Sequence, residues 1–313
     1  MKRVSPQENA ISDIKQPECW CRIVCNAEMQ LPGWSGIYFC EVTTINKFIK
    51  NHVYFFSIAL VFIAMGLLYF CSLFLFRPDN PRDYGIKQVL SYLIPIVFTF
   101  TILLLLKGIK EVGFRKSNIW KGLYLGWFFL AAGVILFVSS YIGVDKTTLS
   151  SPSFGKLLAF TCVVFFVGVF EEVLCRGIIL NTMINQWGHT KNGIIKSIIF
   201  SSLLFGLAHL INLIANPILI IATFSQIVYA FLHGILYASV YVRCRNLWAV
   251  IILHAVYDWL ALGLYIFTPV QDVIVSKDTS IESALMNILL SIPYALIGLY
   301  LVRKKKVKDS RSL

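Results

Sequence analysis

The sequence predicts an all-α membrane protein, a polytopic bundle of about eight transmembrane helices with both termini in the cytoplasm. Composition is the first reason. The chain of 313 residues is 58% hydrophobic and only 14% charged, and its mean hydropathy is +0.74, whereas a soluble domain has about 25% charged residues. A chain this apolar cannot cover itself with polar surface in water. Its length is therefore a guide to the number of membrane spans and not to the number of soluble domains.

Apolar stretches of the required length are the second reason, because a helix needs about 20 apolar residues to cross a bilayer. Eight stretches qualify: His52–Phe76, Lys87–Leu106, Trp120–Val144, Lys156–Leu180, Ile194–Ile214, Pro217–Val242, Leu247–Phe267 and Ala284–Val302. The first is no cleavable signal peptide, because about 50 mostly polar residues precede it. We expect a cytoplasmic N-terminal segment (1–51), an eight-helix domain (52–302) and a basic cytoplasmic tail (303–313).

The distribution of basic residues predicts the orientation. With the N-terminus inside, 21 of the 28 Lys and Arg residues lie on the inner side and 6 on the outer side, and Arg176 lies within a span. The positive-inside rule then places both ends in the cytoplasm, and we expect the plasma membrane. The net charge of +12 favours an anionic inner leaflet. The basic tail is therefore expected to face lipid head groups and not nucleic acid.

Four cysteines gather in the N-terminal segment: Cys19, Cys21, Cys25 and Cys40. Disulfides are not expected in a cytoplasmic segment. The spacing also differs from the paired C-x2-C spacing that is typical of structural zinc sites. We therefore favour a small amphipathic segment on the membrane over a zinc site.

Acidic residues, histidines and arginine that lie well inside the predicted spans are confined to spans four to seven. Each charge in hydrocarbon costs roughly 2.5–3.5 kcal/mol even on the lenient insertion scale, so a cluster of them needs a reason. The set comprises Glu171, Glu172, Arg176, His209, His233, His254 and Asp258. His233 has no ionisable neighbour one turn away, and it is expected to form a structural hydrogen bond between helices.

Helix geometry sorts this cluster into pairs. Glu172 and Arg176 are four residues apart, so they share a helix face and are expected to form a structural ion pair. His254 and Asp258 share a face of span seven in the same way. Glu171 lies about 100° around the helix from Glu172 and faces different surroundings.

Two kinds of chemistry fit the remaining groups. Glu171 would take a proton from water while a histidine holds that water in place, and His254 would donate to a developing oxyanion. Alternatively, Glu171, His209 and His254 would hold a divalent metal, since a glutamate and two histidines make a known catalytic zinc shell. The residues alone leave both alternatives open.

Three short motifs carry a resemblance to a known family. Glu171-Glu172-Val173-Leu174-Cys175-Arg176 matches E-E-x-x-x-R, Phe205-Gly206-Leu207-Ala208-His209 matches F-x-x-x-H, and His254-Ala255-Val256-Tyr257-Asp258 matches H-x-x-x-N/D. In this order, on successive predicted helices, they resemble the CPBP (Abi) family of CAAX-type prenyl-protein endopeptidases and bacteriocin-processing or immunity proteins. The resemblance covers a motif-bearing core of about 156–267.

The resemblance implies a membrane protease, a hydrolase that performs intramembrane proteolysis on a peptide or a membrane-protein substrate. It implies that Glu171 and His209 hold and activate the attacking water and that His254 and Asp258 stabilise the oxyanion. By the same resemblance, Glu172 and Arg176 support the site. It favours a metal-free, glutamate-activated water, with zinc as the alternative.

The chain departs from the family pattern at Asp258, where the prenyl-protein proteases have Asn. An ionised Asp cannot donate a hydrogen bond. Asp258 is therefore either protonated in its apolar setting, or it accepts a hydrogen bond from His254 and orients that ring.

Two alternatives to an enzyme remain open. One is a non-catalytic bacteriocin-immunity or membrane scaffold protein that keeps the fold and binds a partner. The other is a proton- or ion-coupled transporter, since intramembrane acids and histidines also mark ion paths, although the spans show no internal repeat of the kind many transporters carry. In a bacterium the expected substrate is a peptide, a leader sequence or a membrane-protein segment; a prenylated protein is expected only in a eukaryote or an archaeon.

Overall fold

The computed structural model describes residues 48–49, 51–77, 85–106, 112–267 and 279–303. The cysteines of the predicted N-terminal segment and the tail after Arg303 lie outside the described residues. Contacts within the chain divide it into two units, Met1–Asn51 and His52–Leu313. Every helix named below belongs to the second unit.

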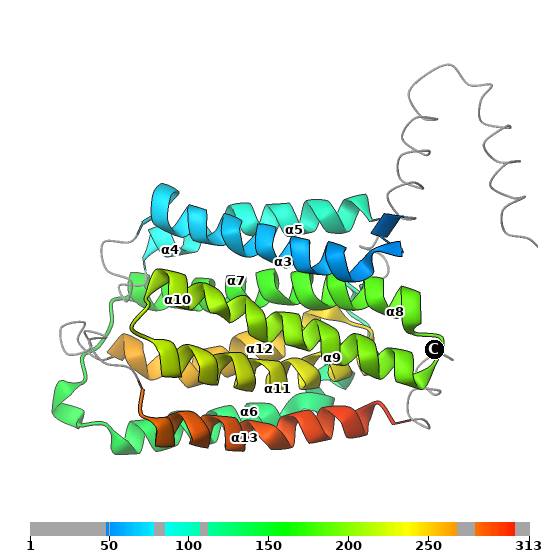
Figure 1. Cartoon of the computed structure of the whole chain (residues 1–313). Coiled ribbons are helices and arrows are strands. Elements are labelled where there is room, and N and C mark those ends of the chain that lie inside the picture. Colours follow the sequence, from blue (N-terminus) through cyan, green and yellow to red (C-terminus); the bar gives the residue numbers. More distant parts are fainter. Residues whose placement is uncertain (1–47, 50, 78–84, 107–111, 268–278, 304–313) are drawn as a thin grey trace, which may run out of the picture. The chain divides into compact units, whose positions relative to one another are not determined.

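All regular elements of the described residues are helical (Figure 1). In chain order they are α3 (Val53–Phe70), η1 (Cys71–Leu75), α4 (Ile86–Ser91), α5 (Leu93–Leu105), α6 (Ile119–Gly143), η2 (Lys146–Thr148), α7 (Phe154–Glu172), η3 (Val173–Leu180), α8 (Asn181–Trp187), α9 (Lys191–Leu207), η4 (Ala208–Leu210), α10 (Ile211–Ala215), α11 (Ile220–Cys244), α12 (Leu247–Leu262), η5 (Gly263–Phe267) and α13 (Ile281–Leu301). Segments η1 and η3 are π-helices, and η2, η4 and η5 are 3-10 helices.

These elements join into eight helices of the described chain that are long and apolar enough to cross a membrane. The finding confirms the predicted all-α fold and the eight spans. The seventh span, Leu247–Phe267, ends at the predicted residues. The fourth is longer than predicted, because α7, η3 and α8 continue one another from Phe154 to Trp187.

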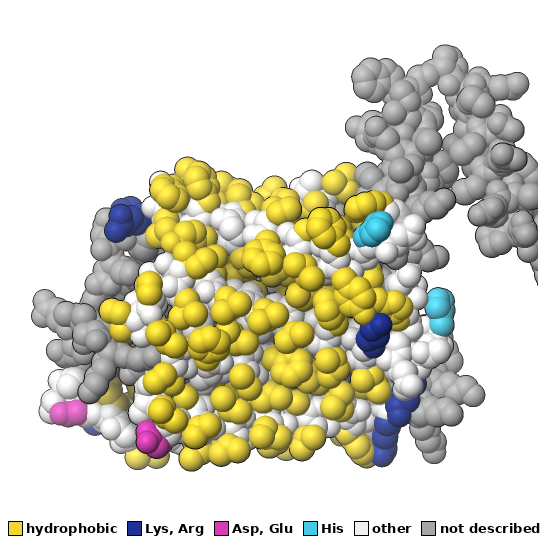
Figure 2. Space-filling view, in the orientation of Figure 1, with side chains coloured by type: hydrophobic (Ala, Val, Ile, Leu, Met, Phe, Trp, Pro, Cys, Tyr) yellow, Lys and Arg dark blue, Asp and Glu magenta, His cyan; other side chains and the backbone are white. Residues whose placement is uncertain are grey.

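The surface of the described chain matches a lipid environment. Many large apolar side chains are exposed on α3, α6 and α13, for example Phe62, Trp120 and Leu296. Figure 2 shows hydrophobic side chains across the middle of one face, with charged side chains confined to its two ends. Since exposed apolar patches of this extent are not tolerated in water, the protein is an integral membrane protein. The orientation of its termini stays a prediction.

Several helices begin at polar residues that satisfy their free backbone N–H groups. The side chains of Ser153, Thr190, Asn246 and Ser280 each accept a hydrogen bond from the backbone N–H three residues later, at the start of α7, α9, α12 and α13. Such caps stabilise a helix start by about 1 kcal/mol. Asn246 also donates to the carbonyl oxygens of Arg115 and Ser117, each at 2.6 Å. It therefore ties the start of α12 to the loop before α6.

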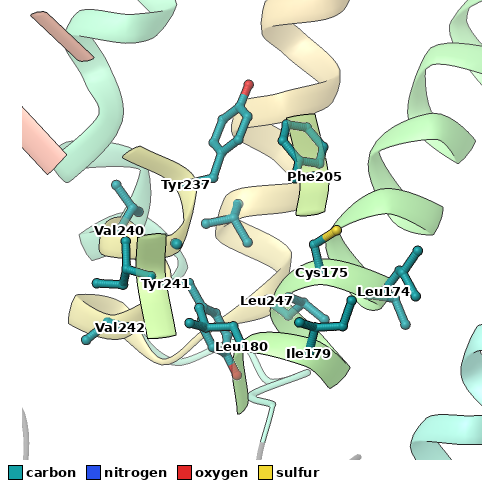
Figure 3. Close-up of a cluster of buried hydrophobic side chains, with 14 of the residues drawn as sticks. Leu174, Cys175, Ile179, Leu180, Phe205, Tyr237, Val240, Tyr241, Val242 and Leu247 are labelled. Atoms are coloured by element: carbon teal, nitrogen blue, oxygen red, sulfur yellow. The ribbon is translucent and has the colours of Figure 1, made fainter. Parts of the chain in front are cut away.

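Helices α11 and α12 are at the centre of the bundle. Helix α11 packs against α9, α6 and α13, while α12 packs against α6 and α7, and Figure 1 shows α3 with α5 on one side of this pair and α6 with α13 on the other. Figure 3 shows part of the buried core, which includes Cys175 and Ile179 of η3, Tyr241 of α11 and Leu247 of α12, and η3 contacts both of these helices. This apolar packing fixes η3 against both central helices.

Close approach of α6 and α12 depends on small residues. Gly122 and Gly126 are one turn apart on α6, and both face α12. A Cβ atom added at Gly122 would overlap the Cβ of Ala249, and one at Gly126 would lie 2.6 Å from Leu253. Small residues at such positions let two helix backbones approach in a membrane, so these glycines set the distance between α6 and α12.

Replacing Gly122 by Leu is therefore expected to lower the unfolding free energy by about 1–3 kcal/mol, the usual cost of overpacking. The measurement is thermal unfolding of the purified protein in detergent. Gly66→Leu is the matched control, because no atom lies within 4 Å of a Cβ added at Gly66. Equal melting temperatures for the two variants would show that the α6–α12 contact does not limit stability.

Candidate active site

The first motif lies at a change in helix type. Helix α7 ends at Glu172, and the chain continues directly as the π-helix η3. All eight residues of η3 are buried. π-Helical turns are rare, and they occur frequently at functional sites. The two glutamates therefore lie in the last turn of α7, and Arg176 lies in the widened turn that follows.

Glu172 and Arg176 form the predicted ion pair. Arg176 Nη1 lies 2.8 Å from Glu172 Oε1, and both side chains are essentially unexposed. The guanidinium also donates through Nη2 to the carbonyl oxygen of Gly234 on α11, at 3.2 Å. Its plane lies over the rings of Phe205 and Tyr237. A buried charge is tolerated only when it is paired and hydrogen-bonded, and Arg176 meets both conditions.

The same glutamate holds His254. Glu172 Oε1 lies 2.8 Å from His254 Nδ1. Since this oxygen also accepts from Arg176, the carboxylate is an acceptor and Nδ1–H of the imidazole donates to it. The ring of His254 stacks on Tyr237, with centroids 5.0 Å apart and planes at 14°. The orientation of His254 is thus fixed, with Nδ1–H toward Glu172, which leaves Nε2 as the nitrogen available for chemistry.

Two further carboxyl groups lie near Nε2 of His254. Asp258 Oδ2 is 3.3 Å away, as expected for residues four apart, and Glu171 Oε2 is 3.7 Å away. These side chains are 27% and 19% exposed, whereas Glu172 is fully buried. Consecutive glutamates therefore have different surroundings, as their angular separation predicts. The structure adds that both of them reach the same imidazole.

His209 lies in the short segment η4, immediately after α9. Its Nδ1 lies 3.1 Å from the carbonyl oxygen of Phe205 and 3.3 Å from that of Gly206. A carbonyl oxygen only accepts, so Nδ1–H donates and Nε2 of the neutral ring carries a lone pair. Among the described residues no partner of Nε2 is present. His209 can therefore accept a hydrogen bond from a ligand or a water molecule.

One pocket, with a cavity volume of about 1280 Å³, joins these groups. Glu171, His209, His254 and Asp258 all line it. Its other lining residues come from the second half of α3, α6 and α12, from the first half and middle of α11 and α13, and from α4, α7, η3, α9 and α10. The pocket therefore occupies the half of the bundle in which α3, α6 and α12 end, and it brings the four predicted residues together.

Sequence reasoning missed one residue and placed another incompletely. Tyr237, which stacks on His254, gave no signal, because a tyrosine in an apolar helix is ordinarily a core residue. His233 forms the expected interhelical hydrogen bond, with Nε2 3.1 Å from Ser291 Oγ. It also lines the pocket. The sequence did not predict this, because His233 has no ionisable neighbour one turn away on its own helix.

A metal site was the alternative for this cluster. Within the described residues, no three or more His, Cys, Asp or Glu side chains are arranged so that they could hold a metal ion. Glu171, His209 and His254 line one pocket without forming such a group. Whether a metal is used therefore stays a prediction.

Fold and site together define a polytopic membrane protein with acidic and histidine side chains around an accessible pocket. Residues 153–260 match the family model described as Type II CAAX prenyl endopeptidase Rce1-like. The match runs from the cap of α7 to the end of α12 and contains all three motifs. It covers about a third of the chain and confirms the resemblance seen in the sequence. No curated protein and no solved structure was found to match the chain.

Replacing Arg176 by Met is expected to lower the unfolding free energy by about 3–5 kcal/mol, because Glu172 would keep a buried charge with one partner fewer. Denaturant unfolding in detergent measures this change. Arg115→Met is the matched control, since the side chain of Arg115 is exposed. Adding Glu172→Gln to Arg176→Met should recover part of the loss. No recovery would mean that the pair contributes little through its charge.

Proposed function

We propose that this chain is an intramembrane endopeptidase of the CAAX type, which hydrolyses a peptide bond in a peptide or a membrane-associated protein. The observation that carries the proposal is the convergence of Glu171, His209, His254 and Asp258 on one accessible pocket. The family match supports it, because the matched segment contains all four residues. The proposed membrane is the plasma membrane, with both termini in the cytoplasm.

In this proposal Glu171 is the general base. Its carboxylate accepts a proton from a water molecule, and the water oxygen attacks the carbonyl carbon of the scissile peptide bond. His209 holds that water through the lone pair on Nε2, since its Nδ1–H is occupied by the carbonyl oxygens of Phe205 and Gly206. When the tetrahedral intermediate collapses, the proton on Glu171 passes to the leaving amine.

The negative charge on the tetrahedral intermediate requires a donor. His254 supplies it through Nε2–H in its imidazolium form, in which both ring nitrogens donate, while Glu172 accepts from Nδ1–H on the opposite side of the ring. A donor that is already oriented needs no rearrangement during the reaction, and one such donor accelerates acyl transfer about 100–1000-fold. Asp258 either accepts from Nε2–H and orients it, or, when protonated, donates to the oxyanion itself.

The proposed water is activated by glutamate and not by a metal. The proposal is supported by the side-chain geometry, in which Glu171 faces His254 Nε2 at 3.7 Å and Glu172 is already shared between Arg176 and His254. Such a site needs no resident cofactor. Cleavage in isolated membranes should therefore persist after treatment with EDTA or 1,10-phenanthroline, and its loss on chelation with recovery on adding zinc would contradict this part of the proposal.

Glu171→Gln is expected to abolish proteolysis, because the amide cannot accept the proton from water. The measurement compares new peptide N-termini in membranes from cells that express wild type or the variant. A set of termini that appears only with the wild type identifies the cleavage sites. Glu282→Gln is the matched control: it makes the same chemical change at an exposed position at the start of α13.

The outcome of this comparison also separates the alternatives. Identical N-termini in wild type and Glu171→Gln, with a cellular phenotype that survives the mutation, would favour a non-catalytic immunity or scaffold protein. A phenotype that requires Glu171 and alters ion or proton flux, without new N-termini, would favour a transporter. Either result rejects the protease.

Asp258→Asn is expected to keep cleavage within about tenfold of the wild type, since an amide still accepts from His254 and can also donate to an oxyanion. Asp258→Leu removes both capacities, and the rate of cleavage is expected to fall about 100-fold or more. Rates at the sites identified above measure both effects, with equal amounts of each variant in the membrane. Full activity of Asp258→Leu would remove Asp258 from the mechanism.

A further inference from the structure

A second group of polar side chains lines the pocket beside the reacting groups. It consists of His233 and Tyr229 on α11, Tyr257 on α12, and Ser291 and Tyr294 on α13. Tyr257 directly precedes Asp258 in the chain, and the ring of His233 meets that of Tyr257 edge-on, with centroids 5.4 Å apart. This group is therefore the wall of the pocket next to Asp258.

Hydrogen bonds determine which nitrogen of His233 is free. Ser291 Oγ–H donates to the carbonyl oxygen of Asn287 at 2.7 Å. The hydroxyl oxygen then accepts from His233 Nε2–H at 3.1 Å. Nδ1 of the neutral ring is left as a hydrogen-bond acceptor, and it has no partner among the described residues. The ring is 93% buried, at 7% exposure.

Aromatic rings surround this acceptor. Phe129, Tyr257 and Tyr294 meet the His233 ring edge-on, and Tyr229 lies against it at a tilt, all with centroids within 5.7 Å. No described residue is a hydrogen-bond partner of the three tyrosine hydroxyl groups. Nδ1 belongs to a side chain that lines the pocket, so a ligand with a donor in the right place can pair with it. Aromatic walls in turn favour an aromatic ligand, which gains both buried area and edge-to-face contacts.

We propose that His233, Tyr229, Tyr257 and Tyr294 form a specificity subsite for a substrate side chain with an aromatic body and a hydrogen-bond donor, tyrosine or tryptophan, beside the scissile bond. The donor of that side chain binds His233 Nδ1, and the aromatic rings of the wall pack against its ring. His233 is thus a specificity-determining residue and takes no part in the bond-breaking step. The inference rests on the proposed protease function, because the pocket must first hold a peptide.

The experiment uses synthetic peptides that copy a Glu171-dependent cleavage site and carry Tyr, Trp, Phe or Leu at the residues flanking the scissile bond. The kcat/KM of the full-length protein in detergent is measured for each peptide. At one flanking position the wild type should prefer Tyr or Trp over Phe about tenfold or more, because Phe leaves the buried acceptor unpaired. His233→Phe removes the acceptor while keeping an aromatic ring, so the ratio should fall to about 1.

A second variant keeps the inference testable where His233→Phe does not fold. Ser291→Ala removes the acceptor of His233 Nε2–H, so the ring is free to adopt the tautomer with its proton on Nδ1. The preference for Trp over Phe should then fall several-fold, since the indole can only donate. A tyrosine hydroxyl also accepts, so the preference for Tyr should fall less.

The outcomes separate the two proposals. Glu171-dependent cleavage with no preference for Tyr or Trp, or with a preference that both His233→Phe and Ser291→Ala leave unchanged, overturns the subsite and keeps the protease. Where His233→Phe gives no folded protein, an unchanged preference in Ser291→Ala is sufficient to overturn the subsite. If no Glu171-dependent cleavage exists at all, the proposed function fails and the subsite fails with it.

Discussion

A single buried oxygen atom, Glu172 Oε1, holds the central helices together. It accepts from Arg176 Nη1 and from His254 Nδ1, each at 2.8 Å. Arg176 in turn donates to the backbone of α11 at Gly234. The oxygen thus connects α7, η3, α11 and α12, in a place where an unpaired charge would be very costly. Both His254 Nε2 and the wall of the pocket depend on this arrangement, because each is carried by one of the connected helices.

The site contains two glutamates and two histidines, and the two members of each pair have different surroundings. Glu171 and Glu172 are neighbours in sequence, yet one lies on an accessible wall and the other has no exposed surface. His209 is held by backbone carbonyl oxygens and His254 by a carboxylate. Sites that perform acid–base chemistry commonly assign different roles to like groups through their surroundings. Here a change of helix type immediately after Glu172 accompanies that difference.

The eight spans could be predicted because an apolar run of about 20 residues has few other structures available to it. The Glu172–Arg176 and His254–Asp258 pairs were predictable because residues four apart share a helix face. The π-helix η3 and the stacking of Tyr237 on His254 were not predicted, since neither leaves a local pattern in the sequence. The contact between His233 and Ser291 joins residues 58 positions apart, so only the packing of α11 against α13 reveals it.

The pocket lies in the half of the bundle in which α3, α6 and α12 end, and side chains of the opposite half are closely packed in the described part of the chain. In that half, η3, α11 and α12 meet through apolar side chains such as Ile179, Leu180 and Leu247. The pocket extends past Glu171 to Leu174 and Cys175 of η3, and a layer of packed apolar side chains lies beyond them. An ion that crossed this layer would meet the cost of placing a charge among apolar side chains. In the proposed protease, this layer would separate the water of the pocket from the opposite side of the membrane.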